Sequence, residues 1–212
     1  MPSLLTPPAT EKTRIINLVR HANLKAFTDF LKTNKYDLNF MEGSLQFTPL
    51  LVAASTNNLE FVQKLIEYGA NPNYSPPRIT PLMSASLGGF NSIVNHLIKK
   101  KADVNTVTPY GFTALYYAIC NNHINIIKTL IKHGADVNFL TPDGDHLILK
   151  ALDNKQYDVV KILLEAGGKP TGQNIFGHNC YQLAMKNRYF DLLEQLPKIE
   201  PLTHNQYEEI LI

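Results

Sequence analysis

The sequence predicts an all-α fold, a solenoid of helical hairpins joined by short β-hairpin fingers, with about six repeats. Three observations predict it: a period near 33 residues, an alanine at a constant distance after each start, and a second apolar segment closed by a small-residue turn. A fixed period of about 20–50 residues is typical of arrays whose units bury their apolar faces against their neighbours. The expected repeats lie near 12–40, 41–73, 74–105, 106–138, 139–171 and 172–200, in a single domain over 12–200.

The first helix of each repeat is predicted from its start. Thr48–Leu50, Thr80–Leu82 and Thr113–Leu115 begin at spacings of 32 and 33 residues. A threonine hydroxyl satisfies a free N–H at a helix N-terminus, and a proline at the first helical position loses no hydrogen bond there. Two further starts, His146–Ile148 and Asn179–Tyr181, follow at the same period. Five residues after each of the five starts stands an alanine, small enough to let a neighbouring helix approach closely: Ala53, Ala85, Ala118, Ala151 and Ala184.

The second helix of each repeat is predicted from apolar residues at helical spacing. These segments are Phe61–Ile66, Ile93–Ile98, Ile126–Ile131 and Val159–Leu164. Gly69, Gly134 and Gly167 follow three of them and can adopt the left-handed conformation that ends a helix. Lys101 stands at the equivalent position after the other segment, where a positive φ costs about 1 kcal/mol.

The fingers are predicted from turn residues that precede each first helix. Gly111, Gly144 and Gly177 lie two residues before a start, where a turn needs a permissive backbone. Gln46 and Arg78 occupy the same place in the earlier repeats, so we expect those fingers to differ in shape.

At these residues the chain resembles the ankyrin-repeat family. The segment Gly111–Asn138 is similar to that family's pattern of a Gly-x-Thr-Pro-Leu start, an alanine in the first helix, a Leu-rich second helix and Gly-Ala-Asp-Val-Asn. The resemblance covers most of the chain, with the first and last repeats least regular, as expected of capping repeats. A composition rich in Asn, Ile, Lys and Tyr is similar to that of ankyrin proteins from intracellular bacteria, including secreted effectors, and from large viruses.

The resemblance implies a protein that binds another protein through its concave face and finger tips. Apolar residues stand where the family usually has polar tips, and an apolar patch in water indicates a partner interface. Some of these side chains can instead pack on the adjacent finger. The candidate partner-binding residues are Leu45, Phe47, Tyr74, Ile79, Tyr110, Phe112, Asp143, Asp145 and Phe176.

Catalysis, metals and cofactors are not expected. The seven histidines form no HExxH pattern, and no serine lies in a Gly-x-Ser-x-Gly turn. Gly88 and Gly89 lack the preceding strand that a dinucleotide site requires. Cys120 and Cys180 lie far apart without metal-ligand spacing, a usage that suits the reducing cytoplasm.

Composition also limits the partners. The net charge is +2 and the one basic run, Lys99–Lys101, falls at the end of a predicted helix, so no nucleic-acid partner is expected. No apolar stretch approaches the roughly 18 residues of a membrane span. We therefore expect a cytoplasmic monomer that binds a protein, which would be a host protein if the chain is an effector.

The sequence is compatible with several roles. The protein could be an adaptor, a secreted effector, or a regulatory inhibitor that occludes an enzyme. Proteins that resemble ankyrin arrays can be hydroxylated by an asparaginyl hydroxylase on the Asn of a Val-Asn step, which marks Asn105 and Asn138. Residues 1–11 are expected to be a flexible segment, and 201–212 either a capping helix or a signal for secretion into a host cell.

Overall fold

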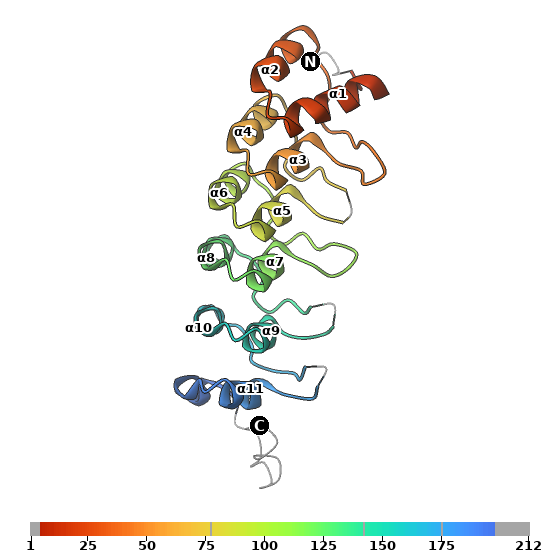
Figure 1. Cartoon of the computed structure of the whole chain (residues 1–212). Coiled ribbons are helices and arrows are strands. Elements are labelled where there is room, and N and C mark those ends of the chain that lie inside the picture. The colour runs from red at the N-terminus through yellow and green to blue at the C-terminus, as the bar shows by residue number, and fades with distance from the viewer. Residues whose placement is uncertain (1–4, 77, 142, 175, 198–212) are drawn as a thin grey trace. The chain divides into compact units, whose positions relative to one another are not determined.

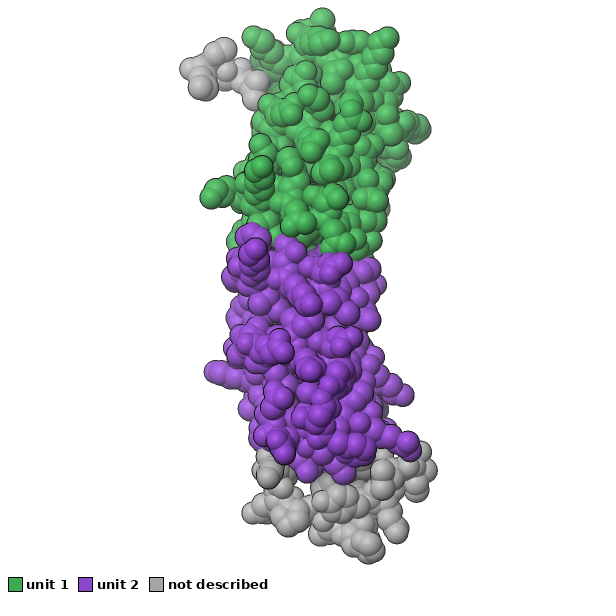
Figure 2. All heavy atoms as spheres, turned by 90° about the vertical axis from the view of Figure 1, so that its left-hand side faces the viewer, with its two compact units in different colours: residues 1–109 green, residues 110–212 purple. Residues whose placement is uncertain are grey.

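The computed structural model describes residues 5–76, 78–141, 143–174 and 176–197, and within them the chain forms six consecutive helix pairs (Figure 1). This confirms the predicted fold of repeated helical hairpins. The chain divides into two compact units, residues 1–109 and 110–212 (Figure 2). The division falls inside the predicted domain 12–200.

The first unit contains three helix pairs. The pairs are α1 (Ala9–Arg20) with α2 (Leu24–Thr33), α3 (Pro49–Ser55) with α4 (Leu59–Glu67), and α5 (Pro81–Leu87) with α6 (Asn91–Lys99). The first helices contact one another in the order α1, α3, α5, and α4 contacts α6. Within this unit the hairpin loops lie on the side of α3 and α5, away from α4 and α6 (Figure 1).

The second unit repeats the arrangement. Its elements are α7 (Ala114–Cys120) with α8 (Ile124–Lys132), α9 (Leu147–Asp153) with α10 (Tyr157–Glu165), and α11 (Cys180–Lys186) with the 3₁₀ helix η1 (Phe190–Gln195). Helix α9 contacts both α7 and α11, and α10 contacts α8. Each first helix therefore packs against its own partner and against the first helix of a neighbouring pair.

The helix starts are confirmed by their hydrogen bonds. The hydroxyl oxygens of Thr48, Thr80 and Thr113 each accept a backbone N–H three residues on, at 3.1 Å. Asn179 caps α11 in the same way at 2.9 Å, whereas His146 gives α9 no side-chain cap. All five predicted alanines are 0% exposed, so the first helices approach one another over these small side chains.

The turn residues lie where the sequence predicts them, but the fingers contain less β-structure than predicted. Gly111, Gly144 and Gly177 have positive φ, and Gln46 and Lys101 adopt positive φ, 53° and 68°, without being glycine. Where β-hairpin fingers were predicted, three fingers are closed by isolated antiparallel bridges: Glu42 to Phe47, Leu140 to His146 and Gln173 to Asn179. The finger of Tyr110 and Phe112, which lies within the described residues, is a turn without such a bridge.

The N-terminal segment differs from the prediction. Helix α1 begins at Ala9, and Leu5 exchanges backbone hydrogen bonds with Lys35 and Asp37 at 3.2 and 2.9 Å. Residues 5 and 9–11 therefore belong to the first helix pair rather than to a flexible segment. At the other end, the predicted tail or cap over 201–212 lies outside the described residues.

Candidate functional site

The predicted binding residues fall into two groups according to their distance from the next helix start. Residues three positions before an N-cap stand at the finger tips and are exposed: Leu45 at 59%, Tyr110 at 53%, Phe176 at 75%, and Asp143. Residues one position before an N-cap are half-buried or buried: Phe47, Ile79, Phe112 and Asp145. We call the first group the finger tips and the second group the finger anchors, because Phe112 stacks on Tyr116 of α7 and the backbone of Asp145 pairs with Thr141 across its finger. Tyr74, farther from its helix start, is half-buried.

Asp145 is buried, in contrast to the exposed finger tips. It is 8% exposed, and its backbone N–H donates to the Thr141 hydroxyl at 3.1 Å while its carbonyl accepts the Thr141 N–H at 2.8 Å. Burial, and then the charges of Asp153 and Asp143, raise the pKa of the Asp145 carboxyl. The expectation that Asp145 is an exposed finger residue is therefore wrong.

An aromatic cluster joins one finger to helix α7 in the second unit. The Phe112 ring stacks on Tyr116 with centroids 5.0 Å apart and lies 5.6 Å from Tyr117, and the two tyrosine rings are 6.0 Å apart. All three side chains are half-buried. The two tyrosines were not predicted as site residues, although a signal existed: the second repeat has Leu51 and Val52 at these positions.

The cluster is polar at its edge. Burial, and then a hydrogen bond to Cys120, raise the pKa of Tyr116, and burial also raises the pKa of Tyr117. Both hydroxyls therefore stay protonated at neutral pH and can donate hydrogen bonds. The three rings meet at interplanar angles between 29° and 73°, and they form an aromatic cluster that carries two hydroxyl groups. Tyr110, two residues before Phe112, is exposed at the tip of the same finger. Aromatic side chains with a polar group are common at protein interfaces.

A groove lies beside the last described finger, and we call it the C-terminal groove. It has a volume of about 410 Å³ and runs between the end of α9, the finger of Phe176, and α11. Leu152 and Leu183 are buried in its floor, and Lys155 and Lys186 are exposed on its walls.

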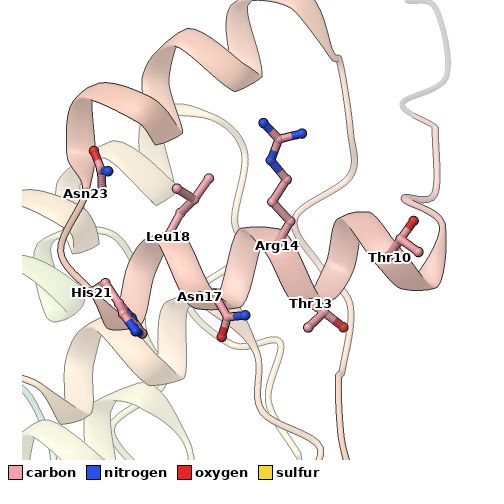
Figure 3. A pocket seen from close by; sticks show the side chains of 7 residues that line it. All are labelled: Thr10, Thr13, Arg14, Asn17, Leu18, His21 and Asn23. Carbon is pink, nitrogen blue, oxygen red and sulfur yellow. The ribbon is translucent and has the colours of Figure 1, made fainter.

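Two hollows of the first unit lie against α1, and Thr13 and Asn17 line both of them. One, of about 260 Å³, lies between α1 and the finger of Leu45 and Phe47, where the Thr13 hydroxyl donates to Glu42 at 2.7 Å. The other, of about 550 Å³, is lined mainly by polar side chains of α1 (Figure 3). Arg14 and Leu18 point toward α2, and the Arg14 guanidinium lies 4.6 Å from the centre of the Phe30 ring.

The backbone N–H groups of Asn105 and Asn138 each donate a hydrogen bond to the carboxylate of an aspartate two residues earlier. The Asn138 side chain also reaches the next repeat, where it donates to the Gly167 carbonyl and accepts from the Lys169 N–H. Within the described ranges, no three histidine, cysteine or acidic side chains gather as a metal site, and no helix is long and apolar enough to cross a membrane.

Comparison with known proteins agrees with this geometry. A family model described as ankyrin repeats (3 copies) matches residues 14–108 and again 73–141. Alpha-latrocrustotoxin-Lt1a of Latrodectus tredecimguttatus is 37% identical over 97 residues, covering 45% of this chain and 7% of the toxin. Zygote-specific protein 3 of Chlamydomonas reinhardtii is 30% identical over 112 residues, covering 53% of this chain and 29% of that protein.

A relative from Atelerix albiventris, ankyrin repeat, SAM and basic leucine zipper domain-containing protein 1, is 36% identical over 92 residues. That similarity covers 41% of this chain and 19% of the relative. In each case the similarity spans less than a third of the curated relative's length.

Proposed function

Because the chain belongs to the ankyrin-repeat family, we propose that it is a non-catalytic module that binds a protein partner through its finger tips and first helices. The observation that carries the proposal is the character of the tips. Leu45, Tyr110 and Phe176 each expose more than half of their surface, and all three occupy the same position relative to a helix start. Exposed large apolar side chains at equivalent positions favour a binding surface, because aromatic anchors supply much of the energy of protein interfaces.

The aromatic cluster supports the same surface in the second unit. The rings of Phe112, Tyr116 and Tyr117 hold one another in place. These side chains therefore lose little conformational freedom when a partner covers the neighbouring Tyr110. Asp143, also at a finger tip, adds a charged group at the edge of this face.

The proposal includes an adaptor role. Two more specific roles, an inhibitor that occludes an enzyme and a secreted effector, depend on what the partner is. An occluding inhibitor would use the same surface but would abolish the activity of a bound enzyme. A cytoplasmic setting fits the two free cysteines, Cys120 and Cys180. A secreted effector would act on a host protein, and a signal at 201–212 would have to be tested by transport of the full chain.

Hydroxylation of Asn138 is a weaker assignment. Both polar atoms of its side chain bond the backbone of the next repeat, at 3.2 and 2.8 Å. An asparaginyl hydroxylase that needs this side chain in its own active site would first have to open that junction. The contacts favour a structural role for Asn138.

The test is quantitative affinity capture with three full-length baits: the natural chain, Tyr110→Glu, and Phe190→Glu as a matched control. Phe190 is 60% exposed but lies in η1 rather than in a finger. We expect at least one protein that the natural chain and Phe190→Glu retain and Tyr110→Glu loses. If the three baits retain the same proteins in the same amounts, the finger-tip proposal is wrong.

A further inference from the structure

We propose that the C-terminal groove binds an acidic segment of the partner protein, with an apolar side chain against Phe176 and a carboxylate paired with Lys155 and Lys186. The proposal rests on the proposed function, because it specifies the chemistry of the partner at one part of the finger surface.

The walls of the groove are fixed by hydrogen bonds to buried or backbone groups. The Asn174 side chain, 5% exposed, accepts from the N–H groups of Phe176 and His178 at 3.0 and 2.9 Å and donates to the Asp153 carboxylate at 2.9 Å. On the opposite wall, the Asn187 side chain donates to the Leu152 carbonyl at 2.6 Å. The finger and α11 are thus each tied to the end of α9, and a ligand meets a preformed groove.

The apolar part of the groove is open to water. Phe176 has the largest exposed fraction, 75%, among the exposed large apolar side chains of the described chain. Its ring lies 6.5 Å from the His178 ring, and Leu152 and Leu183 form the floor. A volume of about 410 Å³ accommodates one or two side chains, so the natural occupant is part of a peptide segment rather than a whole helix face.

The charged side chains that line the groove are two lysines and one aspartate, an excess of positive charge. Among the described residues, neither Lys155 nor Lys186 has a carboxylate within 4.0 Å of its ammonium group; the ion pairs there involve other lysines and an arginine. The acidic residue of the lining, Asp153, is already engaged by Asn174. Two unpaired ammonium groups against one hydrogen-bonded carboxylate favour an acidic ligand by charge complementarity.

Lys155 is suited to this role because its backbone is immobilised while its side chain is not. Its φ is 57°, its N–H donates to Leu152, and its carbonyl accepts the Tyr189 hydroxyl at 2.6 Å. The backbone of Lys155 is therefore held in place beside the groove, and its flexible side chain can move the ammonium group toward a bound carboxylate. A carboxylate next to an apolar side chain in the ligand would satisfy Lys155, Lys186 and Phe176 together.

The test uses a displayed library of random twelve-residue peptides selected on the immobilised full-length chain. Enriched peptides are synthesised, and their dissociation constants are measured by fluorescence anisotropy. The variants are Lys155→Glu/Lys186→Glu in the groove and Lys128→Glu/Lys132→Glu as the control, which makes the same charge change on the exposed face of α8. Circular dichroism checks that both variants keep their helices, and Lys155→Gln/Lys186→Gln serves as a milder second variant.

We expect the enriched peptides to carry Asp or Glu close to an aromatic or aliphatic residue. The groove variant should weaken their binding about tenfold or more, the neutral variant less, and the control less than about twofold. Raising the salt concentration should weaken binding to the natural chain, because exposed charge pairs are screened.

Peptides without an acidic excess, or acidic peptides whose affinity the groove variant leaves unchanged, would overturn the inference. If such peptides still lose affinity on Tyr110→Glu, the proposed function survives and only the chemistry assigned to the groove is wrong. If no peptide is enriched, or if the two lysines do not affect binding, the inference fails, while the proposed function is decided separately by the affinity capture with Tyr110→Glu and Phe190→Glu.

Discussion

The side-chain oxygen of Asn138 accepts a hydrogen bond from the backbone N–H of Lys169, 2.8 Å away and one repeat later. The Asn138 amide also donates to the Gly167 carbonyl, so one side chain satisfies two backbone groups at the end of the next helix pair. Asn39 and Asn73 make the equivalent pairs of hydrogen bonds in the first unit. Within each unit, the side chains of these asparagines bond the backbone of the next repeat and so link successive repeats.

The first prediction follows from this link. Asn138→Ala leaves a backbone N–H and a carbonyl without their protein partner, and we expect it to lower the free energy of unfolding by about 1–2 kcal/mol in urea titrations followed by circular dichroism. Asn121→Ala is the control, because the exposed Asn121 side chain donates a single hydrogen bond, within its own repeat. Equal losses for the two variants would show that Asn138 does not join the repeats.

The second prediction concerns the left-handed turn at Lys101, where φ is 68°. Lys101→Gly removes the strain of a side chain at positive φ but frees the unfolded chain, so we expect a net gain of about 0.5–1 kcal/mol. Gly69→Ala at the equivalent position, φ 94°, should instead lose about 1 kcal/mol or more, since its added Cβ meets no atom and only backbone strain changes. Changes of the same sign in the two variants would contradict this account of the turn.

The third prediction separates a finger tip from a finger anchor. Phe112→Ala loses ring contacts with Tyr116 and Tyr117 and should lower the free energy of unfolding by about 1–2 kcal/mol. Tyr110→Ala, at an exposed tip, should change it by less than about 0.5 kcal/mol. Thermal and urea unfolding of both variants decide this, and a large loss for Tyr110→Ala would place that ring in the core instead of on the binding surface.

The fourth prediction concerns the thiols. Burial, and then the charge of Asp145, raise the pKa of Cys180 from 9.0 to about 12, so at pH 8 this buried thiol is protonated as well as inaccessible. We expect a thiol reagent such as DTNB to label one cysteine in the folded protein and two in urea, and to label none in folded Cys120→Ser. Rapid labelling of folded Cys120→Ser would contradict the buried position of Cys180.

The same pKa shift gives a pH dependence with a definite sign. Because the folded state raises the pKa of Cys180, its neutral thiol contributes stability that is complete below pH 9 and is lost as pH rises toward 12. The free energy of unfolding should therefore fall between pH 9 and 11 less steeply in Cys180→Ala than in the natural chain. An equally steep fall in both would assign the alkaline dependence to other groups.

Much of the fold could be predicted because its signals are local and repeated. Thr48, Thr80 and Thr113 cap their helices through atoms three residues away, and the five alanines are buried by a packing rule that recurs at each repeat. Features that depend on distant partners could not be predicted in the same way. The pairing of Leu5 with Lys35 and Asp37 has no local signal, and neither does the reach of Asn138 to Lys169.

For the candidate site, the sequence predicted which residues lie in the fingers, but not which of their side chains are exposed. Sequence position placed Tyr110, Phe112, Asp143 and Asp145 together in the fingers, but it did not separate exposed tips from anchors. That separation depends on how each finger folds back: Asp145 pairs with Thr141, and Phe112 stacks on Tyr116. Once the register is known, the position three residues before each N-cap identifies the tips.

Site-specific photo-crosslinking tests the central claim most directly. A benzophenone amino acid is placed at position 110 in one full-length chain and at position 190 in another, and each chain is irradiated in the same lysate. Both positions are exposed in the second unit, but only 110 lies at a finger tip. We expect discrete protein adducts from position 110 and none of the same mass from position 190. Identical adducts from both positions, or adducts from 190 alone, would show that the fingers are not the binding surface.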